Sequence, residues 1–385
     1  MDNNLSFHKT ISRSNKPLTN DASWDKVLEM YKLKDYKATL LGILDYVDLG
    51  LVNKTGNEER NEFIIPHGSA ELHLTISDND FTVHAPFLNI KNSKKIPLMR
   101  KVAELNFSPL NLAAIRLNDD ILSFHFSCPL ELCEPYKIYE VLREICIYAD
   151  SYDDEFISKF DASWIHQPKI TPYSADQKQS AWDTMHAYIE EARSGISYFE
   201  TKRSFNFAWD ILMVTLMKIE YYIQPEGLLR IEIEKIVSYL ISSRDALNDK
   251  INRGKNFLDK LSQYDRSKFD DDLYASETFI PYKIRSNEQA VKTATENAYV
   301  QAQKEREQGN HLAATMTIAY QFLYLMYHNN LPAGILNAIE NSMEEAGGKS
   351  WKESSDILFD AMEAIMKGKK MPAEKKGFFK KLFGN

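Results

Sequence analysis

The chain has 385 residues, of which 44% are hydrophobic and 12% aromatic, so it is long enough for two or three domains with substantial cores. Its formal net charge is −8, whereas non-specific nucleic-acid binding needs clustered Lys and Arg to neutralise phosphates. We therefore expect no nucleic-acid partner.

The cysteine pattern and the apolar stretches favour a reducing cytoplasm. Cys128, Cys133 and Cys146 are too few for a disulfide framework and lack the spacing of a zinc site, so we expect buried thiols. The N-terminal residues show no apolar stretch typical of a secretory signal. The longest apolar stretch, residues 209–217, is too short to span a bilayer.

Changes in composition divide the chain into five parts. Residues 1–20 are polar, and we expect them to be loose. Residues 21–162 combine helical and strand patterns, whereas residues 163–176 contain two prolines and little periodicity, which indicates a linker. Residues 177–370 predict an all-helical domain, and residues 371–385 form a basic and aromatic tail.

The first domain opens with helical patterns at residues 24–31 and 40–47, followed by a strand at residues 62–66. Two β-hairpins follow, with an amphipathic helix at residues 96–107 between them and a further helix after Pro135.

Turn residues set the register of both hairpins. A turn at Asp78-Asn79 would pair His73 with His84 in the first hairpin. A turn at Asp119-Asp120 would pair Leu117 with Leu122 and Ile115 with Phe124, so that apolar side chains meet on one face of the second hairpin. The predicted fold class is therefore α+β, with an antiparallel five-stranded sheet flanked by helices, followed by an all-α helical bundle.

The segment PLMRKVAELNFSPLNLAAIRLNDDILSFHFSCPLE resembles the type III secretion chaperone-like fold that Tir-type chaperones and YbjN-type proteins share. The matching features are a helix that ends in Leu105-Asn106, a polar turn at residues 118–120, and Pro129-Leu130 before the last helix. The resemblance covers less than a third of the chain. It implies a small acidic bacterial domain, often dimeric, that binds an extended partner peptide along sheet or helix surfaces. A client-binding role carries over better than type III secretion itself.

The second domain is predicted from helical periodicity alone. Residues 205–223 are apolar almost all round, which is typical of the central helix of a bundle. Residues 268–284 are irregular and predict a long loop. The other predicted helices are residues 181–199, 228–247, 289–308, 311–327, 333–345 and 351–366.

Three histidines and a run of aspartates are candidate metal ligands. His73 and His84 would face each other on the polar face of the sheet, and His125 of the other hairpin faces the same side. Metal sites use three or four ligands, and the spacing forces no third one, so we expect solvent-facing histidines, no metal and no cofactor. Residues 270–272 are three aspartates without the glycine and distant glutamate of a calcium loop, which favours a solvated loop or helix cap.

The tail is the strongest sequence candidate for a partner-binding surface. A helical turn would gather four apolar side chains on one side, flanked by lysines, and would become ordered only on contact. Docking on a partner is favoured over docking on the protein's own bundle, and adsorption to anionic lipid ranks last. The proposed partner-binding residues are Phe378, Phe379, Leu382, Phe383, Lys380 and Lys381.

These features together favour a cytoplasmic, chaperone-like or adaptor protein that recognises an unidentified protein or peptide client, as a monomer or a homodimer. The chain has no GxGxxG, Walker, GxSxG or HExxH motif, and we expect no enzymatic activity. Client binding would use main-chain hydrogen bonds at sheet edges and helix grooves. The alternative is a regulatory or sensor protein that binds a small molecule in the helical bundle; its polar groups would be Tyr221, Tyr222, Tyr324 and Tyr327, which otherwise pack in the core.

Overall fold

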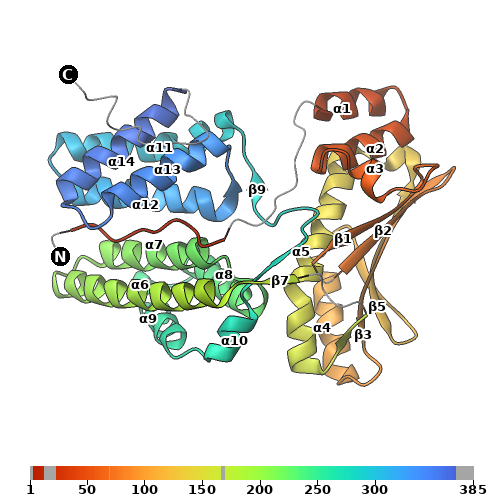
Figure 1. Cartoon of the computed structure of the whole chain (residues 1–385), viewed down its shortest axis with the longest axis horizontal. Coiled ribbons are helices and arrows are strands. Elements are labelled where there is room, and N and C mark those ends of the chain that lie inside the picture. The colour runs from red at the N-terminus through yellow and green to blue at the C-terminus, as the bar shows by residue number, and fades with distance from the viewer. Residues whose placement is uncertain (1–2, 13–22, 69, 166–169, 370–385) are drawn as a thin grey trace. The chain divides into compact units, whose positions relative to one another are not determined.

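The computed structural model describes residues 3–12, 23–68, 70–165 and 170–369, and the chain divides into two compact units (Figure 1). The sheet unit comprises residues 14–172 and 274–282. The helical unit comprises residues 1–13, 173–273 and 283–385. Each unit is therefore built from segments that are far apart in the sequence, and the predicted tail at residues 371–385 lies outside the described residues.

The sheet unit begins with three helices and then forms most of its strands in chain order. The helices are α1 (Trp24–Lys32), α2 (Tyr36–Val47) and α3 (Leu51–Thr55). The strands are β1 (Glu62–His67), β2 (Ala70–Ile76), β3 (Asp80–Asn89), β4 (Ala114–Asn118), β5 (Ile121–Pro129), β6 (Ser163–Trp164), β7 (Ile170–Pro172) and β8 (Tyr274–Ser276). Helix α4 (Lys95–Phe107) lies between β3 and β4, and the 3-10 turn η2 (Leu130–Leu132) and α5 (Pro135–Phe160) follow β5.

The main sheet is antiparallel, with the strand order β1-β2-β3-β5-β4 and with β6 added at the end of β3. The predicted antiparallel sheet is confirmed, and so are its registers: His73 pairs with His84, and Ile115 pairs with Phe124. The two short strands β6 and β7 lie in the predicted linker. They form there because Leu88 and Asn89 at the end of β3 pair with β6, whereas β8, which lies far along the chain, pairs with β7.

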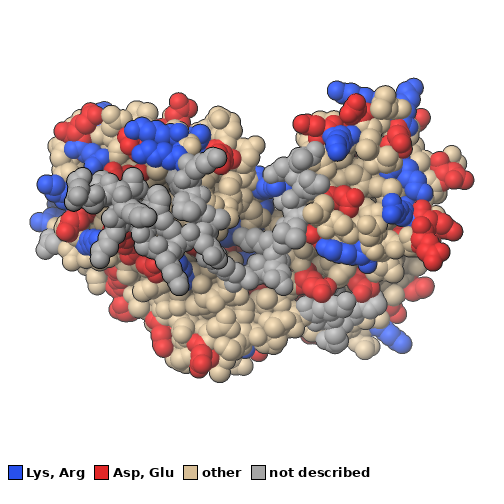
Figure 2. All heavy atoms as spheres, turned by 45° about the horizontal axis from the view of Figure 1, so that its top comes forward, with Lys and Arg blue, Asp and Glu red and all other residues tan. Residues whose placement is uncertain are grey.

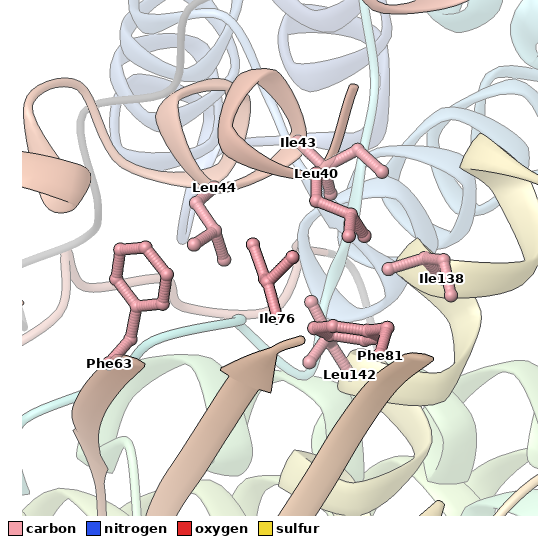
Figure 3. Close-up of a pocket in the computed structure, with 8 residues that line it drawn as sticks. All are labelled: Leu40, Ile43, Leu44, Phe63, Ile76, Phe81, Ile138 and Leu142. Carbon is pink, nitrogen blue, oxygen red and sulfur yellow. The ribbon is translucent and has the colours of Figure 1, made fainter. Parts of the chain in front are cut away.

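Helices α2 and α5 cover one face of the sheet, and the core lies between them and the strands. Figure 3 shows eight apolar side chains from these helices and from β1, β2 and β3 that point toward one another. They leave no room for a bound water molecule, so this cluster is packed core. Its members are Leu40, Ile43, Leu44, Phe63, Ile76, Phe81, Ile138 and Leu142.

The helical unit consists mainly of helices. They are α6 (Ala175–Thr201), α7 (Phe205–Ile223), α8 (Gly227–Ile241), α9 (Leu247–Ser262), α10 (Arg266–Asp271), α11 (Glu288–Glu307), α12 (His311–His328), α13 (Ala333–Ala346) and α14 (Trp351–Met366). Two short strands, β9 (Ile284–Arg285) and β10 (Asn329–Asn330), form a parallel pair.

Helix α7 is the central helix of this unit, as its sequence predicts. It packs on α6, α8, α9 and α12, and every residue from Ile211 to Ile223 is buried. Prediction missed α9 and α10. Helix α9 buries only Ile251, Gly254, Leu258 and Leu261, and most of its other residues are polar. Within the described residues, no helix combines the length and the hydrophobicity that a membrane crossing needs.

Residues 268–284 were predicted to form a long loop. In the structure they include the end of α10 and strand β8, and residues 274–282 belong to the sheet unit. After α10, residues 274–282 pack beside β1, where the N–H of Gly68 donates to the Glu277 carbonyl at 2.8 Å. The buried His67 holds the segment: its Nδ1 accepts from the Phe279 N–H at 3.1 Å, and its Nε2 lies 3.0 Å from the Cys146 carbonyl. These contacts specify the neutral Nε2–H tautomer.

Candidate functional site

The three candidate histidines lie in one row across adjacent strands. His73 pairs with His84, and His84 pairs with His125, with the His73 and His84 rings 6.2 Å apart. Burial is the largest cause that lowers the pKa of His84 and of His125; the neighbouring imidazoles add to it, and Arg116 adds at His125. A straight row across strands does not converge on one point. Among the described residues, no group of three or more His, Cys, Asp or Glu side chains could hold a metal ion.

The other sequence candidates have structural contacts. Asp270 accepts from Arg266 in α10, and the Asp272 carboxylate accepts the N–H of Leu229 near the start of α8. The Cys128 and Cys133 sulfurs lie 3.4 Å apart as free, buried thiols, and burial raises the pKa of Cys133.

At the β4 edge of the sheet, side chains bond the main-chain groups that a further strand would use. The Asn106 amide donates to the Ile115 carbonyl at 2.9 Å and accepts from the Ile115 N–H at 2.7 Å. The Glu144 carboxylate accepts the N–H groups of Asn111, Leu112 and Ala113 just before β4. Asn106, the residue before the last one of α4, thus closes this edge.

The β1 edge is closed in a similar way. The Glu62 carbonyl accepts from the Asn57 N–H at 3.0 Å, and Gly56 forms an antiparallel β-bridge with Phe63. Pro66 has no N–H to donate. Both edges thus carry features that natural sheets use against strand addition. The sequence suggested that a client binds by pairing with a sheet edge. At these positions, few main-chain N–H and C=O groups are left for such pairing.

Apolar side chains remain exposed next to the β4 edge, and Phe107 at the end of α4 is 90% exposed. Others in this region are Ile96, Leu112, Leu117 and Ile121. Figure 2 shows basic and acidic side chains interspersed on the face that it draws. Charge of a single sign therefore does not dominate that face.

The most complete binding geometry lies in the helical unit, where the helices hold the beginning of the chain. Residues 3–11, which we call the N-terminal arm, run between the layer of α6 and α7 and the layer of α12 to α14 (Figure 1). Leu5 and Phe7 are only 4% and 3% exposed, and the Phe7 ring stacks on Tyr221. The arm differs from the expected loose segment, because Leu5 and Phe7 bury apolar surface against these helices.

Helix side chains and the turn between α13 and α14 bond the main chain of the arm at alternate residues. The Ser6 N–H donates to Glu191 at 2.7 Å, and the Ser6 carbonyl accepts from Lys218 at 2.8 Å. The His8 N–H donates to the Tyr188 hydroxyl at 2.8 Å. At Asn4, the N–H donates to the Lys349 carbonyl and the carbonyl accepts from the Gly348 N–H. Main-chain bonds at residues 4, 6 and 8, with buried side chains at 5 and 7, match the way extended peptides are recognised.

The groove is our name for the surface of Tyr188, Glu191, Lys218 and Tyr221 that contacts the arm. The buried Lys218 lies at its centre. Lys218 is 1% exposed, and its ammonium lies 2.8 Å from Glu191 and 4.1 Å from the centre of the Tyr188 ring. Burial lowers the pKa of Lys218, whereas the Glu191 carboxylate acts to raise it. The Ser6 carbonyl completes the coordination of the ammonium, so the groove holds a peptide main chain at this point through a charged hydrogen bond.

The chain matches no family model, and no curated protein or solved structure is significantly similar to it. The interpretation of the groove therefore rests on its own geometry.

Two glycines let the arm approach the turn between α13 and α14. A Cβ atom at Gly347 would lie 3.1 Å from the Phe7 nitrogen, and Gly348 has a φ of +72°. The Asn4 side chain also donates to the Ala346 carbonyl at 3.2 Å. The turn thus forms the end of the groove that receives residues 3–7.

Sequence reasoning singled out part of this site but not its role. Tyr221 and Tyr222, named as polar groups for a small molecule, contact Phe7 and His8 of the arm. Lys218, Glu191 and Tyr188 were not singled out. A lysine in a mostly apolar helix is a usable signal, because a buried charge requires a partner.

Proposed function

We propose that this chain is a non-enzymatic binding protein, chaperone-like or adaptor in role, that recognises an extended segment of a protein or peptide client. The observation that carries the proposal is the groove of the helical unit, whose side chains bond a peptide main chain at alternate residues. Main-chain bonds of this kind supply affinity, and the sites of Leu5 and Phe7 supply selectivity.

The sheet unit supports the same proposal in a different way. Its edges are closed by Asn106, Glu144 and Pro66, while Phe107 and its neighbours expose apolar side chains. This surface suits side-chain contacts with a folded partner better than strand addition. The chaperone-like resemblance, the cytoplasmic location and a homodimer remain parts of the proposal.

A peptide-binding measurement tests the proposal. The probe is a synthetic peptide of residues 3–12 with a C-terminal fluorophore, and the protein is the full chain with Leu5→Ser and Phe7→Ser, which weaken its own arm. We expect anisotropy titration to give a dissociation constant on the order of 1–100 µM, typical of short extended peptides.

The matched control is the same peptide with serine at both anchor positions, which should bind at least about tenfold more weakly because it lacks the two apolar side chains. Circular dichroism establishes that the variant is folded. A folded variant that binds neither peptide, or binds both equally, contradicts the proposal.

A further inference from the structure

The arm has the properties of an occupant that can leave its groove. Residues 4–11 form no helix or strand of this unit, so release of the arm would unfold no helix. Residues 1–13 belong to the helical unit, whereas residues 14–172 belong to the sheet unit. The chain that follows the arm therefore enters the sheet unit, whereas side-chain and main-chain hydrogen bonds hold the arm on the helices.

The polar contacts of the arm also suit its exchange for another peptide segment. Glu191 is partly exposed, and Lys9 forms an ion pair with Glu344 at 2.8 Å at the surface. When the arm leaves, water can reach Lys218 and Glu191, so the pair would not remain as buried, unsatisfied charges. Apolar side chains in place of both Lys218 and Glu191 would hold a permanent segment at lower cost, because the charged pair would not have to be desolvated.

The contacts of the arm define which peptide could take its place in the groove. Two apolar side chains two residues apart fill the positions of Leu5 and Phe7, and the second stacks on Tyr221. Between them, the Ser6 hydroxyl lies 3.2 Å from the Glu191 carboxylate, which favours serine or threonine. The main chain of this middle residue must present its N–H to Glu191 and its carbonyl to Lys218.

We propose that the N-terminal arm is an intramolecular competitor that occupies the groove until an extended segment of another polypeptide, with the pattern aliphatic–Ser/Thr–aromatic, displaces it. This inference rests on the proposed function and adds the class of ligand and its regulation. A tethered segment acts at an effective concentration in the millimolar range. A free peptide with similar contacts therefore binds the intact chain on the order of 100-fold more weakly than a chain whose arm is weakened.

The test compares three forms of the full chain with the fluorescent peptide of residues 3–12. They are the wild type, the Leu5→Ser/Phe7→Ser variant, and a variant with Asn3→Cys and Ser350→Cys. Asn3 and Ser350 face each other in an antiparallel bridge of the type without direct hydrogen bonds, where two cysteines can form a disulfide. The single Ser350→Cys variant controls for the loss of the α14 cap that Ser350 provides.

We expect the arm-weakened variant to bind the peptide about 100-fold more tightly than the wild type, and the oxidised double-cysteine variant to show no binding. Dithiothreitol should return that variant to the level of the Ser350→Cys control. Equal affinity of the wild type and the arm-weakened variant, or equal binding before and after reduction, overturns the inference but leaves the proposed function standing. Failure of every folded form to bind overturns the proposed function itself.

Discussion

The sheet unit and the helical unit satisfy their buried polar groups over very different sequence distances. In the sheet unit, hairpin partners lie close in sequence, and Glu155 pairs with Lys159 one helical turn away. In the helical unit, Lys218 bonds Ser6 across 212 positions, and Tyr221 donates to Glu340 across 119 positions. Local pattern thus specifies much of the first unit, whereas the second depends on contacts that only the folded chain creates.

The largest expected effect compares two lysines, one from each unit. Lys218→Met should lower the free energy of unfolding by roughly 3 kcal/mol, because it removes the partner of Glu191 and of the partly buried Ser6 carbonyl. Lys159→Met should cost less than about 0.5 kcal/mol, because that lysine is exposed and pairs with Glu155 within one helix.

Urea unfolding of both variants, followed by circular dichroism, checks this difference. Losses of the same size at the two positions would contradict the comparison between the units.

The second prediction concerns a carboxyl group in α7, whose replacement should raise the free energy of unfolding rather than lower it. Burial raises the pKa of Asp210 to about 6. The folded state therefore binds more protons than the unfolded state between the ordinary pKa of Asp and about 6, and stability falls as pH rises through that window. Asp210→Asn should stabilise the protein by about 2 kcal/mol above pH 7 and by almost nothing near pH 4.

Thermal or urea unfolding at pH 7.5 and at pH 4 measures this change. A stabilisation that is the same at both pH values would show that ionisation of Asp210 is not its source.

The sheet unit also has long-range contacts, and the third prediction breaks those of His67. His67→Leu removes the acceptor of the Phe279 N–H and the partner of the Cys146 carbonyl, at a cost of about 1.5 kcal/mol. Hydrogen exchange should then speed up at residues 277–279 before it does in β2 and β3. Unchanged exchange at Phe279 would mean that His67 does not hold this segment.

Much of the sheet unit could be predicted from its sequence because its information is local. Alternation around the Asp78-Asn79 and Asp119-Asp120 turns specified the strands and their registers, and it placed His73, His84 and His125 on one face. Helix α7 was equally clear, because a helix that is apolar almost all round is typically the central one.

The candidate site was not predictable in the same way. Leu5 and Phe7 alternate with polar residues over too short a stretch to predict a strand, and nothing local in the sequence places them against Glu191 or Lys218. The return of residues 274–282 to the sheet unit has the same origin, because its contacts with His67 join distant segments. The sequence by itself determined the elements and the local pairings; only the tertiary structure decided which distant segments satisfy the buried charges and main-chain groups, because desolvation makes those groups costly until partners reach them.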